Sequence, residues 1–176
     1  MCIRAELENT IEAASKVDVV SPNHAELGEL FGKVPHAEDG SLDRSVIEDC
    51  ARHLCKSRDT TDWSITAVVR CGRDGCYVYN DRQAQWLPAY HASSPEKVID
   101  PTGGGNGFLG GFAVGLVRTK DAIKAAIWGS VSASFCIEQV GVPTLSQVAD
   151  QSERWNGVNV GDRLADFERR CCLHKS

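Results

Sequence analysis

The sequence predicts an α/β fold, and three observations support this class. Residues 65–69 form a short apolar run and residues 17–20 contain three valines, which is the β-branched content of strands. Two helical segments separate these runs, so a right-handed crossover between parallel strands is the natural connection. A polar turn with three consecutive glycines then opens an apolar helix at Phe108.

Composition places the chain among ordinary folded domains. Its 176 residues, 42% of them hydrophobic, suffice for one domain that buries about 70% of the surface exposed on unfolding. The net charge of −5 argues against a nucleic-acid-binding surface, which is normally basic. No apolar run approaches the ~20 residues of a membrane span. We therefore expect neither a nucleic acid nor a membrane as a partner.

The cysteine pattern indicates reduced thiols. The chain has eight cysteines, but its first residues do not form a signal peptide. We therefore expect a cytoplasmic protein, with a nuclear location as the alternative. No Cys-x-x-Cys occurs, and this spacing does not favour zinc.

The first predicted elements are a helix over 6–15, the strand 17–20 and a helix over 24–30, which Gly32 closes. Asn23 follows the strand, and Glu26 lies one turn later. Ligands of open α/β sheets gather at such carboxyl ends of strands. Alternatively, Asn23 caps the helix and Glu26 stabilises its first turn. Both interpretations stay open, and the residues alone favour the cap.

A third helix is predicted where Ser45 and Glu48 fit a capping box. Its apolar positions should belong to the core: Val46, Ile47, Cys50, Ala51, Leu54 and Cys55. After the strand 65–69, a turn containing Gly72 and Gly75 leads to a hairpin strand over 76–79, and 85–87 forms another short strand. An ordinary turn explains these two glycines as well as a ligand does.

The glycine turn is the strongest functional signal. Gly103, Gly104 and Gly105 lie at a helix N-terminus, where backbone N–H groups lack partners and the helix dipole favours an anion. Alternatively, the glycines of this helix mark close packing, since each interior glycine costs about 1 kcal/mol relative to alanine. The surrounding Asp100, Thr102 and Asn106 favour a phosphate cradle.

This segment resembles the second signature of the PfkB/ribokinase family of carbohydrate kinases. Asp100, Thr102, Gly103 and Gly105 fall on that pattern. Where the family has the aspartate that takes the proton from the substrate hydroxyl, this chain has Asn106. Fungal relatives carry a similar Asp-Pro-Thr-Gly-Gly-Gly-Asn sequence. The resemblance implies a ribokinase-like three-layer α/β/α fold, present here only as the C-terminal half of the family domain.

The resemblance also implies a binding site for ATP. Asn23 and Glu26 are similar to the family's Asn-x-x-Glu motif, which organises Mg²⁺ and water near the transferred phosphate. Gly72 and Gly75 match the family's Thr-x-Gly-x-x-Gly beside the nucleotide, with Arg70 where threonine is usual. Arginine is a good phosphate partner, so Arg70 can replace the hydroxyl contact.

Four further assignments follow from the same resemblance. Asp100 and Thr102 are similar to residues that hold a monovalent cation in some family members. Ser130 and Ser134, in a predicted helix over 120–139, would line the side of the adenine pocket. Helix packing is the alternative for both serines, and the sequence slightly favours it.

The match runs from about residue 17 to 144, and we divide the chain into a partial kinase domain, 1–149, and a polar extension, 150–176. The chain is then a fragment or truncated paralogue, or it needs a protein partner or a second copy to cover the exposed sheet.

Two functions remain open. The first is transfer of the ATP γ-phosphate to a hydroxyl of a sugar or related small molecule. The second is a non-catalytic nucleotide-binding or scaffold homologue. Asn106 favours the second, because a side-chain amide accepts no proton at neutral pH.

Overall fold

The computed structural model describes residues 4–56, 65–147 and 153–173. The chain divides into two compact units, Met1–Trp86 and Leu87–Ser176. The elements of the first unit are α1 (Arg4–Ala14), β1 (Val19–Val20), α2 (His24–Leu30), α3 (Arg44–Lys56), β2 (Thr66–Arg70), η1 (Gly72–Asp74), β3 (Cys76–Tyr79) and β4 (Ala84–Leu87), whose last residue is the first of the second unit. Those of the second are η2 (Pro95–Lys97), α4 (Gly104–Thr119), α5 (Ala122–Ile137), β5 (Leu145–Gln147), β6 (Glu153–Trp155), β7 (Val158–Asn159) and α6 (Val160–Leu173).

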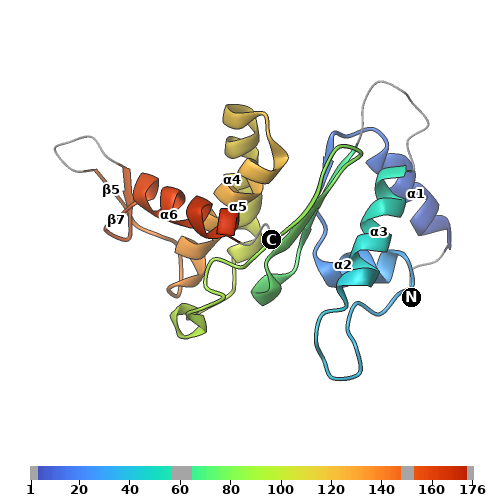
Figure 1. Ribbon diagram of the computed structural model, residues 1–176, viewed down its shortest axis with the longest axis horizontal. Helices are drawn as coiled ribbons and strands as arrows, with labels where there is room; N and C mark the ends of the chain where they lie inside the picture. Colours follow the sequence, from blue (N-terminus) through green and yellow to red (C-terminus); the bar gives the residue numbers. More distant parts are fainter. Residues whose placement is uncertain (1–3, 57–64, 148–152, 174–176) are drawn as a thin grey trace. The chain divides into compact units, whose positions relative to one another are not determined.

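The first unit is built on a sheet of order β1-β2-β3-β4. Strands β1 and β2 are parallel, with Val19 opposite Thr66, and β2 and β3 form an antiparallel hairpin, with Arg70 opposite Cys76. Both the parallel pair and the hairpin confirm the sequence-based expectations. Helices α2 and α3 lie beside each other next to this sheet (Figure 1).

The core of the first unit lies between α3 and the sheet. Four of the six predicted core positions of α3 are buried: Ile47, Cys50, Ala51 and Leu54. They pack with Ala67, Val69 and Tyr77 of the hairpin, while Val46 and Cys55 border this core partly buried. The predicted apolar stripe is therefore confirmed.

Helix α3 begins differently from the predicted capping box. The Asp43 carboxylate Oδ1 accepts hydrogen bonds from the N–H groups of Ser45, at 3.0 Å, and Val46, at 3.3 Å. Asp43 therefore satisfies the first turn, and Ser45 already lies within the helix. Glu48 instead accepts a hydrogen bond from the indole Nε1 of Trp86, at 2.7 Å. The capping box at Ser45 and Glu48 was wrong because an aspartate two residues earlier is an equally good cap.

In the second unit, α4 and α5 pack antiparallel at very short range. A Cβ placed on Gly107 would lie 2.7 Å from the Cys136 Sγ, and one on Gly111 would lie 2.8 Å from the Trp128 carbonyl oxygen. A Cβ on Gly115 would lie 2.8 Å from the Cβ of Trp128. Close packing therefore explains these glycines. The interpretation left open from the sequence holds for this stripe of α4.

Helix α5 begins two residues after, and ends two residues before, the bounds predicted from the sequence. Lys120 ends α4 in the left-handed region, with φ 56°. Asp121 then caps α5, because its Oδ1 accepts hydrogen bonds from Ile123 N, at 2.8 Å, and Lys124 N, at 3.0 Å. The predicted helix over 120–139 is therefore the shorter Ala122–Ile137.

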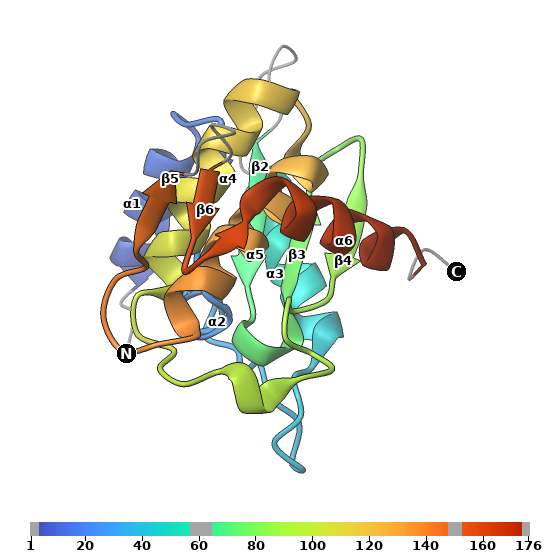
Figure 2. The same cartoon turned by 90° about the vertical axis from the view of Figure 1, so that its left-hand side faces the viewer.

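The polar C-terminal region contributes ordered structure. Strands β5, β6 and β7 form an antiparallel sheet in which Leu145 pairs with Trp155, and α6 contacts β6 and β7 (Figure 2). Phe167 on α6 is fully buried, with its ring centroid 5.1 Å from that of Tyr90. Residues 150–152 and 174–176 of the predicted extension lie outside the described residues. Among the described helices, none combines the length and apolar character needed to cross a bilayer.

We expect Gly111→Ala to destabilise the protein by about 1–3 kcal/mol, because the added methyl overpacks the α4–α5 contact. Gly110→Ala is the matched control, since nothing lies within 4 Å of its Cβ position. This control should instead stabilise the helix by about 0.4–1 kcal/mol. Chemical denaturation of both variants measures the difference. Equal stabilities would contradict the close helix contact.

Candidate phosphate-binding segments

The turn before α4 presents backbone amides at the helix N-terminus. Gly103 caps the helix with φ 82°, a left-handed conformation that glycine adopts without strain. Gly104 N donates to the Pro101 carbonyl at 3.2 Å, so this N–H closes the turn. The amides of Gly103, Gly105 and Asn106 have no acceptor within the described ranges. The backbone N–H groups without an acceptor are therefore those of residues 103, 105 and 106. The sequence predicted 103, 104 and 105, so Asn106 replaces Gly104 in this set.

The same turn is fixed from both sides. Thr102 N donates to Asp100 Oδ1 at 2.9 Å, and hydrogen bonds from Thr102 lower the pKa of the Asp100 carboxyl. The Ile137 carbonyl accepts from Ile99 N, at 2.9 Å, and Asp100 N, at 3.2 Å. A Cβ on Gly104 would lie 2.7 Å from the Ile137 Cγ2, so glycine is required there for packing. The C-terminal end of α5 therefore holds the start of the turn.

Asn106 is the third residue of α4, and it is exposed. Its backbone N–H is one of the three without an acceptor, so the backbone of this residue can bind an anion. Its side chain carries no group that removes a proton at neutral pH. At this position, anion binding by the backbone N–H and proton removal by the side chain are therefore separate properties.

Asn23 and Glu26 form a reciprocal capping box at the start of α2. Glu26 N donates to Asn23 Oδ1 at 2.8 Å, and Asn23 N donates to Glu26 Oε2 at 2.7 Å. The structural interpretation favoured from the sequence is therefore present. Gly32, with φ 62°, follows the helix as predicted. Each of the two oxygens keeps a second lone pair for a cation or a water.

Arg70 lies beside this box at the carboxyl end of β2, where Asn23 and Arg70 form a parallel bridge. Its Nη2 donates to the Ser21 carbonyl at 3.1 Å and lies 3.6 Å from Glu26 Oε2. Its Nε is buried without a hydrogen-bond partner among the described residues. A buried donor without an acceptor is costly, so an anion at this guanidinium would satisfy it.

The two hairpin glycines form the turn that follows Arg70. Gly72 begins η1 with φ 56°, and Gly75 ends it with φ 88°. Cys71 N donates to the Gly75 carbonyl at 2.8 Å, which closes this loop. Both glycines are therefore required by the turn itself, whether or not a ligand lies beside it.

Ser130 and Ser134 are both buried on α5. The Ser134 hydroxyl is fully buried, donates to the Val131 carbonyl at 2.6 Å and accepts from Arg163 Nη1 at 3.0 Å. These contacts agree with the alternative given for Ser134 in the sequence analysis, a role in helix packing. No nucleotide contact is needed to explain it.

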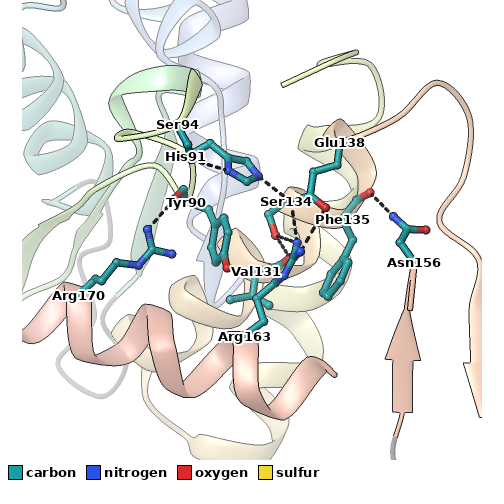
Figure 3. Close-up of polar contacts among 10 residues, drawn as sticks. All are labelled: Tyr90, His91, Ser94, Val131, Ser134, Phe135, Glu138, Asn156, Arg163 and Arg170. Atoms are coloured by element: carbon teal, nitrogen blue, oxygen red, sulfur yellow. Dashed lines mark hydrogen bonds and ion pairs between the residues drawn. The ribbon is translucent and has the colours of Figure 1, made fainter. Parts of the chain in front are cut away.

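Sequence reasoning missed a largely buried polar cluster of His91, Glu138 and Arg163 in the second unit, which Figure 3 shows. Arg163 of α6 donates to both carboxylate oxygens of Glu138, at 2.9 and 3.2 Å. His91 Nε2 lies 3.0 Å from Glu138 Oε1, and burial lowers the pKa of this imidazole. The only sequence signal was Arg163 at helical spacing from Phe167 and Arg170.

Two observations test the fit of a nucleotide phosphate and its metal. The open amides at 103, 105 and 106 and the Arg70 Nε are donors that suit anionic oxygens. In the part of the chain that the structure describes, no three His, Cys, Asp or Glu side chains gather around a metal site. Mg²⁺ commonly binds through one or two carboxylates, waters and substrate phosphates, which fits Glu26.

The first unit contains a parallel strand pair with a hairpin, and in the second unit a glycine turn opens a helix; these are features of the α/β class of proteins. The model of the pfkB family of carbohydrate kinases matches residues 3–148. Protein MAK32 of Saccharomyces cerevisiae is 34% identical over 90% of this chain and 43% of its own length. The chain therefore belongs to the pfkB family of carbohydrate kinases.

Two further comparisons agree. Inositol 3-kinase of Zea mays is 41% identical over 49% of this chain and 22% of its own length. The crystal structure of a fructokinase double mutant from Vibrio cholerae O395, in a form with bound fructose, ADP and potassium, matches with a TM-score of 0.58. That match is 18% identical and covers 93% of this chain and 44% of the fructokinase, so it shows the mixed α/β fold. The chain spans less than half the length of each of these relatives.

We expect Asn23→Ala to destabilise the protein by about 1 kcal/mol, because the first turn of α2 loses its side-chain acceptor. Asn23→Ser keeps a capping oxygen and should retain most of the stability. Both variants remove the amide oxygen, so a role in metal binding predicts that both weaken Mg²⁺-dependent nucleotide binding. Denaturation curves and calorimetric titrations separate the two roles. Full Mg²⁺ dependence in Asn23→Ser would show that Asn23 is only a cap.

Proposed function

We propose that the chain supplies the Mg·ATP-binding part of a carbohydrate kinase that transfers the γ-phosphate to a hydroxyl of a sugar or related polyol. One observation carries this proposal: the amides of Gly103, Gly105 and Asn106 lack acceptors at the start of a helix. Such preorganised donors stabilise charge that develops on a transferred phosphoryl group. Family membership and the sugar and inositol kinases among the relatives support the substrate class.

The remaining residues take supporting roles in this proposal. Asn23 and Glu26 place Mg²⁺ through their free lone pairs and water. Arg70 offers its unpartnered Nε to a phosphate oxygen, next to the turn formed by Gly72 and Gly75. Asp100 and Thr102 contribute oxygens for a monovalent cation, an assignment that the potassium in the fructokinase structure supports. Ser130 lies along the adenine side of the nucleotide, whereas Ser134 acts through packing.

A non-catalytic role is the second candidate, and Asn106 is the observation that favours it. The family's proton acceptor stands at this position, and an amide cannot replace it. Loss of a general base typically removes about 10²- to 10⁴-fold in rate. A chain that keeps the amides and lacks the base would bind nucleotide without turnover and would serve as a binding or scaffold module.

Calorimetric titration with Mg·ATP tests both candidates together. We expect a dissociation constant between about 1 μM and 1 mM, the range usual for enzyme substrates. Gly103→Ala should weaken binding about tenfold, since a left-handed alanine costs roughly 1–2 kcal/mol. Gly110→Ala, on the same helix, should not change it. No binding by the parent chain would overturn both candidates.

The same titration is extended to catalysis with Asn106→Asp and the matched Asn106→Ala. Phosphoryl transfer to fructose and inositol is measured with the chain alone and after addition of the portion of MAK32 that it does not match. The kinase proposal predicts a gain of about 10²- to 10⁴-fold for the aspartate only. Tight nucleotide binding with no gain would favour the scaffold.

We also propose that a protein partner or a second copy pairs with β1. This strand is two residues long and lies at one edge of the described sheet, bonded to β2 alone. An open strand edge is a template for pairing with another chain. Size-exclusion chromatography with light scattering should therefore show a dimer or a complex with the unmatched portion of MAK32. A monomer that unfolds cooperatively in both samples would contradict this.

A further inference from the structure

The last turn of α5 is the point to which the glycine turn is attached. Its final carbonyl, that of Ile137, accepts the N–H groups of Ile99 and Asp100. The Ile137 side chain packs where a Cβ of Gly104 would lie. Any shift of this helix end therefore moves both the beginning of the turn and the first residue of α4.

Glu138, the residue after Ile137, is held by the guanidinium of Arg163. The two hydrogen bonds reach different carboxylate oxygens, and the side chains of Arg163 and Glu138 are only 10% and 19% exposed. A bidentate pair of this kind fixes orientation as well as distance. The guanidinium also lies 3.9 Å from the ring centroid of Phe135 and bonds Ser134 (Figure 3). Through Arg163, helix α6 thus contacts three side chains at the C-terminal end of α5, those of Ser134, Phe135 and Glu138.

A second connection leads from the same cluster to the segment before the turn. His91 lies against Glu138 and contacts the Ser94 hydroxyl through Nδ1, at 3.3 Å. Arg170 Nη1 donates to the Tyr90 carbonyl at 2.9 Å. The segment 90–94 and the end of α5 are therefore both tied to α6. The glycine turn follows the segment 90–94 in the chain and is hydrogen-bonded to the end of α5.

We propose that Arg163, acting through Glu138, is a positioning residue that holds the glycine turn in the geometry that presents the amides of Gly103, Gly105 and Asn106. The effect on nucleotide binding rests on the function proposed above, whereas the effect on the turn does not. Arg163 contacts no ligand in this scheme, since Glu138, Ser134 and two aromatic rings occupy its guanidinium. The region that the sequence marks as a polar extension thereby becomes part of the phosphate site.

Amide hydrogen exchange measured by NMR tests the proposal directly. The reporters are Ile99 N and Asp100 N, whose acceptor is the Ile137 carbonyl. Arg163→Lys keeps the charge and loses the bidentate fork, and Glu138→Gln keeps the shape and loses the charge. Both should accelerate exchange of the reporters by about 3- to 30-fold. Lys120 N at the far end of α4 and Ile47 N in α3 should keep the parent rates.

The control variant is Arg169→Gln on the same helix. Arg169 is 71% exposed and, among the described residues, pairs only with Asp166, at 3.4 Å, so its loss should leave the reporters unchanged. Parent reporter rates in folded Arg163→Lys and Glu138→Gln would overturn the proposal. Equal acceleration of the reporters, Lys120 N and Ile47 N would overturn it as well, because Arg163 would then act only on global stability.

Mg·ATP titration of the same variants separates this proposal from the function on which it builds. If the parent chain binds nucleotide, Arg163→Lys should weaken binding by about 3- to 30-fold, and Arg169→Gln should not. Unchanged affinity despite accelerated exchange would overturn the link to binding. If the parent chain binds no nucleotide, the proposed function fails, while the exchange rates still decide whether Arg163 positions the turn.

Discussion

The close contact between α4 and α5 is the constraint on which the second unit depends. Gly107, Gly111 and Gly115 bring the two helix backbones together, because any side chain at these positions would meet atoms of α5. This approach places Gly104 against Ile137 and brings the end of α5 within bonding distance of the turn. The packing glycines and the proposed binding amides are therefore not competing explanations. The packing glycines of α4 set the position of the backbone amides at the start of the helix.

The oxygens of Asn23 and Glu26 that cap α2 are the same atoms that are proposed above to hold Mg²⁺. Asn23 and Glu26 satisfy each other's backbone N–H groups, so the first turn of α2 is complete without a ligand. A carbonyl or carboxylate oxygen that accepts one hydrogen bond still offers a second lone pair. The cap thus holds both oxygens at the end of β1 in a fixed orientation. Under the proposed function, such preorganisation lowers the cost of ordering Mg²⁺ and its waters at these oxygens.

Elements set by local sequence were predictable, and those set by distant partners were not. The strand pair, the hairpin, the α3 stripe and Gly32 follow from periodicity and turn chemistry, and the structure contains each of them. The start of α3 was missed because Asp43 and Ser45 are both good caps, and sequence gives no ranking between them.

The cluster of His91, Glu138 and Arg163 could not be found in the same way. Its members lie on three segments that are far apart in the chain, and each alone resembles an ordinary surface residue. Only the packing of α6 against α5 shows that a buried His91 and the partly buried side chains of Glu138 and Arg163 lie together. The turn at 100–106 was predictable only in part. Its glycines indicate the start of a helix, but the hydrogen bonds that hold the turn go to the distant carbonyl of Ile137.

Asn106 shows how far the turn geometry constrains function. Binding of an anion at the helix start uses backbone N–H groups, which any residue other than proline supplies. Proton removal from an acceptor hydroxyl uses the side chain, which asparagine does not provide. A substitution at this position can therefore remove chemistry and leave the cradle unchanged. The packing of α4 on α5 and the contacts of α6 with Glu138 bear on the backbone amides in the same way for both candidates proposed above, the kinase and the scaffold. Under the proposed function, the side chain at residue 106, and not the fold around it, distinguishes the two candidates.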